Sequence, residues 1–101
     1  MQWFMILAKD VANSAELRAK HRDEHRKRLE AMQADRRILI AGPLPVDPAR
    51  PDLGVAGSLI VACFEDIDAA WRWADDDPFS HGGVYESVEV RHYKPIFGAT
   101  G

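Results

Sequence analysis

The chain has 101 residues, of which 47% are hydrophobic and 29% charged, and its formal net charge is −3 at pH 7. This length predicts one domain over residues 1–101, and the composition excludes a disordered chain and a strongly basic nucleic-acid-binding protein. No stretch is long and apolar enough to span a bilayer, and the single cysteine, Cys63, fits a reducing compartment. We therefore expect a cytoplasmic protein with neither nucleic-acid nor membrane partners.

The first predicted elements are a strand and a long helix. Residues 2–8 are almost continuously apolar, which is typical of a strand covered on both faces. Asn13, with Glu16 three residues later, resembles a capping box that opens a helix running to about Asp35. Basic residues from position 18 onward alternate with acidic ones, which indicates a solvated face. One face of this helix carries Leu17, His21, His25, Leu29 and Met32.

Three more strands and a second helix follow. The pattern predicts strands over residues 37–41, 58–64 and 84–91, with Gly42-Pro43 ending the first of these. Residues 44–57 contain three prolines and predict a loop. Asp66 can cap a helix whose apolar side chains repeat at helical spacing over residues 67–74.

The order βαββαβ predicts an α+β, ferredoxin-like fold with a four-stranded antiparallel sheet and both helices on one face. The first and third strands are apolar on both sides, so the other face would be a large exposed apolar patch on a monomer. We therefore expect a homodimer or higher homo-oligomer of the dimeric α+β barrel type, with residues 92–97 able to reach the partner subunit.

Asp77 is a candidate site residue. It precedes Pro78, which favours a helical turn beginning at the proline and places Asp77 in N-cap geometry. Gly82-Gly83 then turns the chain into the last strand. The aspartate is either a plain helix cap or a carboxylate held in a fixed position for chemistry.

His25 is the second candidate, because it lies on the helix face that packs against the sheet. It is either a satisfied core histidine or a general acid–base group. His21 and His25 are four residues apart, as paired metal ligands on a helix are, but the glutamate of the usual motif is missing. We expect no metal or other cofactor.

Several segments resemble the YciI-like (YCII) family over nearly the whole chain. They are Arg22–Leu29, Ile40–Pro43, Gly57–Val61 and Trp73–Phe79, with Gly83–Glu86. This sequence departs from the usual pattern at Asp23-Glu24, where Pro-Ala is frequent, and at Arg36-Arg37, where a glycine is common. The second change leaves the turn into the second strand undefined.

The resemblance implies a ferredoxin-like fold, dimerisation through the sheets, and an active site formed by His25 and Asp77. The family includes a dehydrochlorinase that acts on a chlorinated hydroxyquinol. We expect a small-molecule lyase or isomerase with His25 as the acid–base group and Asp77 orienting it, in which Trp3, Phe4 and Phe79 help to wall the pocket. The alternative is a non-catalytic metabolite-binding or accessory domain in which the pair is structural. The substrate-binding residues expected are Ser58, Tyr85, Phe79, Gly42 and Pro43.

Overall fold

The computed structural model describes residues 1–98, and its elements follow the predicted order. They are β1 (Gln2–Asp10), α1 (Ala15–Ala34), β2 (Ile38–Pro45), the 3₁₀ turn η1 (Pro51–Leu53), β3 (Val55–Phe64), α2 (Ile67–Asp75), the one-turn helix α3 (Pro78–His81) and β4 (Tyr85–His92). Among these residues, no helix is both long and apolar enough to cross a membrane.

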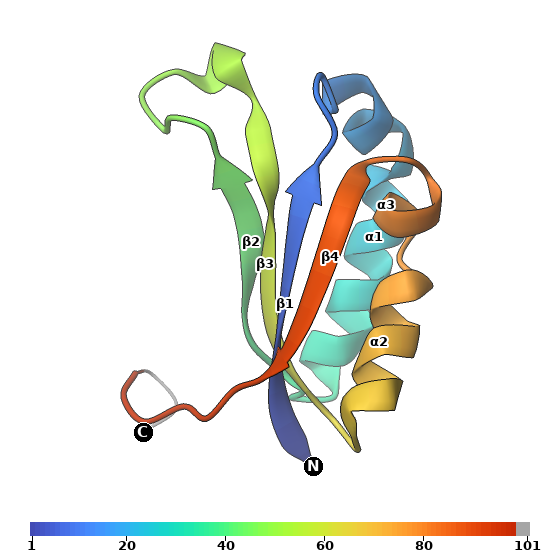
Figure 1. Cartoon of the computed structure of the whole chain (residues 1–101), viewed down its shortest axis with the longest axis vertical. Coiled ribbons are helices and arrows are strands. Elements are labelled where there is room, and N and C mark those ends of the chain that lie inside the picture. The colour runs from blue at the N-terminus through green and yellow to red at the C-terminus, as the bar shows by residue number, and fades with distance from the viewer. Residues whose placement is uncertain (99–101) are drawn as a thin grey trace.

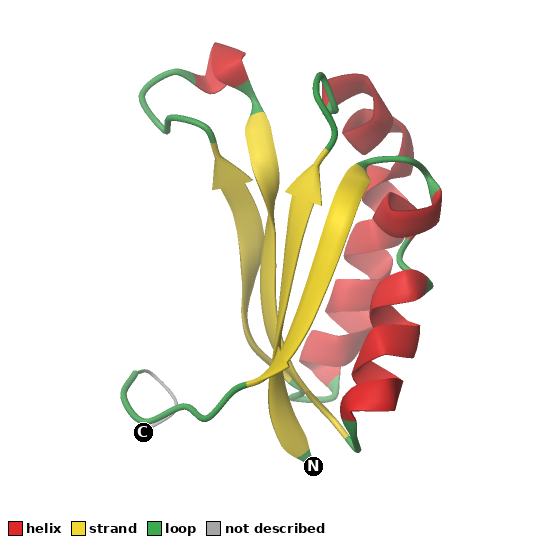
Figure 2. Ribbon diagram, viewed as in Figure 1, coloured by secondary structure: helices red, strands yellow, loops and turns green. Residues whose placement is uncertain are grey.

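The sheet has the strand order β2-β3-β1-β4, and every neighbouring pair is antiparallel. The α-helices α1, α2 and α3 lie against the same face of the sheet (Figure 1), and within residues 1–98 no helix covers the other face (Figure 2). The predicted ferredoxin-like α+β fold is therefore confirmed. The two strands that read as apolar on both sides, β1 and β3, are the central pair, as that pattern requires.

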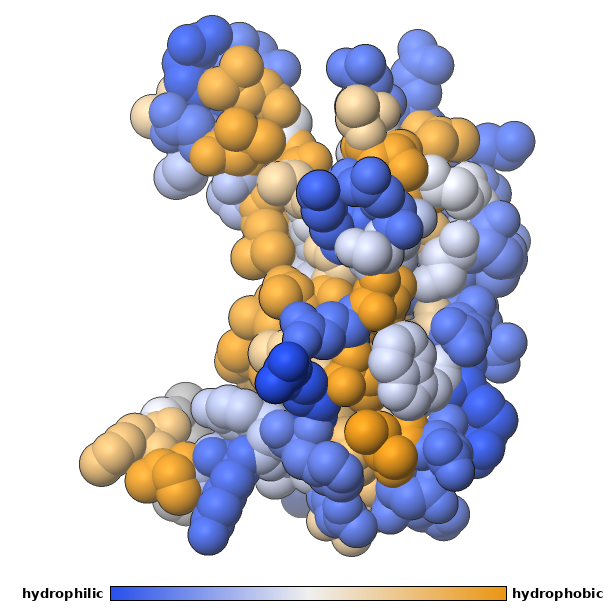
Figure 3. Space-filling model, viewed as in Figure 1, coloured by the Kyte–Doolittle hydropathy of each residue, from blue (hydrophilic) through white to orange (hydrophobic). Residues whose placement is uncertain are grey.

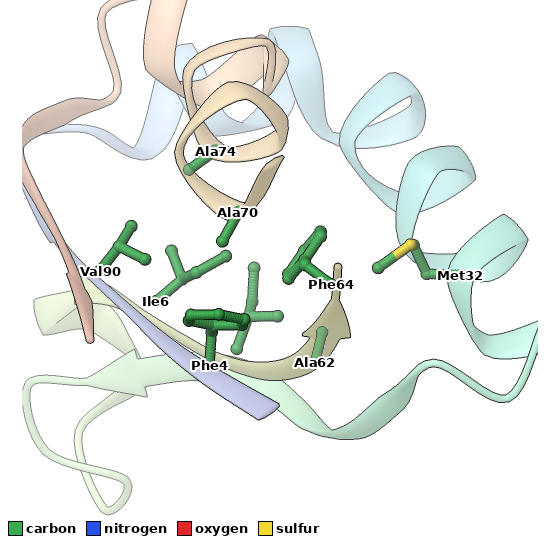
Figure 4. Packing of buried hydrophobic residues seen from close by; sticks show 9 residues of the cluster. Phe4, Ile6, Met32, Ala62, Phe64, Ala70, Ala74 and Val90 are labelled. Atoms are coloured by element: carbon green, nitrogen blue, oxygen red, sulfur yellow. The ribbon is translucent and has the colours of Figure 1, made fainter. Parts of the chain in front are cut away.

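The core lies between the sheet and α2, and the C-terminal part of α1 packs beside it through Met32. Figure 4 shows Phe4 and Ile6 of β1 pointing toward Ala70 and Ala74 of α2. The alanines have short side chains, so α2 packs closely on the sheet, and the remaining volume is filled by the large aromatic rings of Phe4 and Phe64. Each of these buried phenylalanines stabilises the fold by about 1.5–3 kcal/mol through burial.

The opposite face of the sheet is apolar and open. Residues of β1 and β3 that alternate with the core residues point to this side, and they pair across the two strands as Trp3 with Cys63 and Met5 with Val61. Ile40 of β2 is 54% exposed. Figure 3 shows hydrophobic side chains along the hollowed side that faces away from the helices. The tail carries two further exposed apolar side chains, Ile96 and Phe97. Self-association through this face stays a prediction.

The strand boundaries around Gly42-Pro43 differ from the prediction. The pair does not end β2, which continues to Pro45, and β3 begins at Val55 rather than at residue 58. Proline removes a backbone donor, which would break a central strand, but β2 is an edge strand and its outer side needs no partner. The predicted loop over residues 44–57 is thus shortened to a connection containing η1.

The predicted capping box at the start of α1 is wrong. Asn13 has a φ of 57° and precedes the helix, while Ser14 is the N-cap and makes no side-chain cap hydrogen bond. The Ser14 hydroxyl instead donates to Asp10 at 2.6 Å. The cap predicted at Asp66 is confirmed, since its carboxylate accepts from the backbone N–H of Ala69 at 2.8 Å.

Candidate active site

His25 and Asp77 form a buried pair between α1 and the start of α3. The Nδ1 atom of His25 lies 2.8 and 2.9 Å from the two carboxylate oxygens of Asp77. The residues are 52 positions apart in the chain and only 8% and 2% exposed. The fold therefore brings together the two residues that the sequence singled out.

Asp77 is held by its backbone as predicted. Its extended conformation, with ψ of 130°, precedes Pro78 at the first helical position, and its Oδ1 accepts the backbone N–H of Phe79 at 2.8 Å. The same carboxylate thus caps α3 and binds His25. Arg28 lies behind it, with Nη1 3.9 Å from Oδ2. Burial lowers the pKa of Arg28, and the nearby charges of Asp77 and Asp76 partly offset this effect.

The imidazole ring is fixed by stacking as well as by hydrogen bonding. The rings of His25 and Phe79 are 3.9 Å apart between centroids and only 10° from parallel. Phe79 in turn meets the edge of the Tyr85 ring at 5.7 Å. A ring that is stacked on one face and bonded at Nδ1 has one orientation available to it.

This arrangement defines which nitrogen of His25 is reactive. A carboxylate accepts hydrogen bonds only, so Nδ1 carries a proton and donates it to Asp77. In the neutral ring Nε2 then bears the lone pair, and no described residue hydrogen-bonds to it. His25 can take a proton at Nε2 and return it.

A pocket of about 290 Å³ lies in front of this pair. Of the predicted substrate-binding residues, Ser58, Phe79, Gly42 and Pro43 border it together with His25. Its full lining is Arg18, Arg22, His25, Arg26, Gly42, Pro43, Val55, Ser58, Ile60 and Phe79. This volume accommodates a small single-ring compound.

Tyr85 lies below Phe79 and does not border this pocket. Burial raises the pKa of Tyr85 to about 12, an effect that the nearby Ser58 hydroxyl partly offsets. The Tyr85 hydroxyl is buried, and its geometry completes no hydrogen bond within the described part of the chain. Tyr85 therefore packs behind Phe79 and does not form part of the surface that a substrate would touch.

The predicted aromatic wall is wrong in two of its three members. Phe4 is fully buried in the core against Phe64, and Trp3 pairs with Cys63 on the open side of the sheet. Neither borders the pocket, because alternate residues of β1 point to opposite faces and neither is at the pocket end of the strand. Phe79 is the aromatic residue that does line it.

His21 is the other histidine of the predicted four-residue spacing. It packs against the corner after α3, where a Cβ added at Gly82 would lie 2.6 Å from the His21 ring. Within residues 1–98 no group of three or more His, Cys, Asp or Glu side chains is placed to hold a metal ion.

A second buried ion pair was not predicted. Arg18 donates from Nε and Nη2 to the two carboxylate oxygens of Asp10, at 2.6 and 2.9 Å. Its Nη2 also donates to the Gly57 carbonyl and to the Ser58 hydroxyl, at 3.0 and 2.9 Å. Nη1 has no such partner among the described residues. Since Arg18 borders the pocket, Nη1 is the nitrogen with protons free for a ligand.

The solvated-face interpretation of the basic residues is therefore wrong for Arg18, which is 8% exposed. A signal for it exists in the sequence. The buried residues of α1 are Arg18, His25 and Met32, at a spacing of seven that places them on one side of the helix. The alternation of basic and acidic residues along the helix favoured a solvated face instead, and the prediction did not use the spacing of seven.

Comparison with known proteins agrees with this fold. Residues 2–94 match the YCII-related domain family. Protein YciI of Escherichia coli is 43% identical over 96 residues, covering 93% of this chain and 98% of the relative. A protein of Haemophilus influenzae is 40% identical over 97 residues, covering 94% and 99%.

A solved structure of similar fold is among the matches. It is the 5-chloro-2-hydroxyhydroquinone dehydrochlorinase of Burkholderia phenoliruptrix AC1100 in complex with 2,5-dihydroxybenzoquinone. The match has a TM-score of 0.79 and 27% identity, and it covers 91% of this chain and 93% of that one.

Proposed function

This chain belongs to the YCII-related domain family, as its sequence predicted, and on that premise we propose that it is a small-molecule lyase or isomerase. The observation that carries the proposal is the geometry of His25. Its Nδ1–H is bound to the buried carboxylate of Asp77, and its Nε2 is free beside a pocket. The chemistry that suits this arrangement is transfer of a proton to and from a ring compound.

His25 is suited to both directions of proton transfer. An imidazole exchanges protons near neutral pH, and a positioned general base or acid typically accelerates a reaction by about 10²–10⁴-fold. Asp77 keeps the proton on Nδ1, so the ring presents the lone pair of Nε2 to the substrate. When Nε2 takes a proton, the same carboxylate stabilises the imidazolium.

Arg18 and Ser58 are the groups that would hold a substrate oxygen. The Ser58 hydroxyl accepts from Arg18, so its own proton is free to be donated into the pocket. Nη1 of Arg18 offers two further N–H groups. Donors fixed in advance at a buried site stabilise the negative charge that grows on an oxygen when a proton leaves the ring system.

A chlorinated hydroxyquinol illustrates the reaction. His25 takes the proton of a ring hydroxyl and returns it to the ring carbon that carries chlorine, which converts that hydroxyl into a ketone. It then takes the proton of a second hydroxyl. The electron pair of this O–H bond forms a new carbonyl, the ring double bond shifts, and chloride leaves. The net change is loss of HCl and formation of a hydroxyquinone, which balances without an external oxidant.

The open face of the sheet supports a second part of the proposal, that the working unit is a homodimer or higher homo-oligomer. The face displays a central apolar row, and Ile40 beside it is more than half exposed. Covering such a surface with a second copy removes apolar area from water without any additional partner.

The test of the catalytic role is His25→Asn with 5-chloro-2-hydroxyhydroquinone, followed by chloride release and quinone absorbance. Asparagine can still donate to Asp77 but has no group that accepts a proton at neutral pH. We expect turnover by the parent protein and its loss in the variant, with the folded state intact by circular dichroism. The matched control is His81→Asn, an exposed histidine outside the pocket, which should keep full activity.

Two results would contradict the proposal. If His25→Asn unfolds the protein but His25→Gln folds and turns over normally, the histidine is structural. If the parent protein binds ring compounds but converts none of them, including non-chlorinated hydroxyquinols and lactones, the chain is a metabolite-binding domain.

A further inference from the structure

The pocket in front of His25 has a one-sided charge. Three of its ten lining residues are arginines, Arg18, Arg22 and Arg26, and none is acidic. The whole chain, in contrast, has a formal net charge of −3. Positive charges are therefore concentrated at the site. Charges that served only solubility would have no reason to gather around one pocket.

The three arginines are not equivalent. The charge of Arg18 is compensated by Asp10, which it contacts through two hydrogen bonds. Arg22 and Arg26 make no ion pair and no side-chain hydrogen bond within residues 1–98. They are exposed, and at a spacing of four residues on α1 they lie on the same side of the helix, on either side of His25 in the chain.

Two acidic groups near the pocket, Asp52 and Asp77, are already engaged. Asp52 borders the neighbouring hollow together with Arg22, but Arg50 pairs with it at 2.8 Å. Asp77 lies behind His25, where that ring and the Phe79 N–H use its oxygens. Within residues 1–98 neither guanidinium group forms an ion pair, although Asp23 and Glu30 lie three and four residues from Arg26 on α1.

We propose that the substrate is an anion, a single ring carrying a negatively charged oxygen group that Arg22 and Arg26 bind. The inference rests on the proposed function, since it names the substrate class of the same pocket. The charged group lies at the mouth between the two arginines, while the reacting part of the ring extends to His25 and Ser58. Guanidinium groups suit this role because they are always charged and present paired N–H donors to oxyanions.

The charge can come from two sources, a carboxylate substituent or an ionised ring hydroxyl. Binding is therefore measured by calorimetry with three probes at pH 7. The first two are 2,5-dihydroxybenzoate and 2,5-dihydroxybenzamide, which have nearly the same shape and differ in charge. The third is 2,5-dihydroxybenzoquinone, whose acidic hydroxyls give an anion without a carboxylate.

We expect at least one anionic probe to bind about tenfold or more tightly than the neutral amide. In Arg22→Gln/Arg26→Gln this preference should fall to about twofold, and in Arg22→Lys/Arg26→Lys it should be largely retained, because a lysine keeps the charge. The control is Lys27→Gln, an exposed cation of α1 that does not border the pocket. It should leave the preference unchanged. Which anion binds best identifies the source of the charge.

Equal affinity for the amide and both anions would overturn the inference, and so would the absence of saturable binding by any probe. An anion preference that survives the double glutamine variant would also overturn it. These outcomes are separate from failure of the proposed function. A protein that selects anions through Arg22 and Arg26 but catalyses nothing would retain this inference and lose the catalytic one, whereas turnover without anion selection would do the opposite.

Discussion

Asp77→Asn separates the two roles that one carboxylate plays. In the parent protein Oδ1 caps α3 through the Phe79 N–H, and both oxygens face Nδ1 of His25. Asparagine keeps an oxygen for the cap, and Asp and Asn are about equally good at this position. Its Nδ2 is a donor, however, and two donors cannot face each other. The histidine must therefore accept at Nδ1 and move its proton to Nε2.

The expected magnitudes differ strongly between stability and turnover. Loss of a buried hydrogen bond to a charged group costs about 1.5–3 kcal/mol, but the new bond from Nδ2 to Nδ1 restores part of this. We therefore expect the free energy of unfolding to fall by only about 1 kcal/mol. Turnover should fall by about 10³–10⁴-fold, as in a catalytic triad whose aspartate is replaced by asparagine, because Nε2 no longer has a lone pair to accept a proton.

Three measurements test this reasoning. Long-range proton–nitrogen correlation spectra report whether Nδ1 or Nε2 of the His25 ring is protonated, urea unfolding reports stability, and chloride release reports turnover. Asp66→Asn is the matched control, because Asp66 also caps a helix through a backbone N–H but hydrogen-bonds to no histidine within residues 1–98. The reasoning would be refuted if Asp77→Asn kept its proton on Nδ1, or if its turnover stayed within about threefold of the control.

Three further predictions concern stability and assembly. Tyr85→Phe removes a buried hydroxyl without a hydrogen-bond partner and should leave stability at pH 7 equal or higher. The pKa of Tyr85 is raised from 10.0 to about 12 in the folded state, so the unfolded chain ionises first as the pH rises. The free energy of unfolding of the parent should therefore fall by up to about 3 kcal/mol relative to this variant between pH 10 and pH 12. Urea unfolding of the parent and the variant at pH 10 and pH 12 tests this, and an equal loss of stability in both proteins would contradict it. Gly82→Ala should lower stability by about 1–3 kcal/mol, since its Cβ would overlap the Pro78 carbonyl oxygen and lie 2.6 Å from the His21 ring. Gly42→Ala meets nothing within 4 Å and is the control in thermal unfolding. Ile40→Glu on the open sheet face should shift the mass measured by light scattering toward the monomer, and an unchanged mass would count against association through that face.

The sequence predicted the parts of the site that depend on local rules. The Asp-Pro step fixes an N-cap wherever it begins a helix, and the position of His25 follows from the helical period. Asp10 and Arg18 follow no such rule. Asp10 faces the helices next to a register shift in the pairing of β1 with β4, and local sequence does not indicate a bulge at that point. A buried arginine is also rare, so alternating charges favoured a solvated face until the structure supplied the partner carboxylate.

The line of buried residues on α1 explains how one helix serves both core and site. Arg18, His25 and Met32 share one side of the helix, but the surface beneath them changes along its length. At one end Arg18 is bound by Asp10 and the β3 backbone, and at the other end Met32 packs in the apolar cluster. The helix is thus fixed at both ends by interactions of different kinds, and the histidine lies between them. The helix holds His25 in place, the stacked Phe79 ring fixes how the imidazole is turned, and the hydrogen bond to Asp77 decides which nitrogen carries the proton.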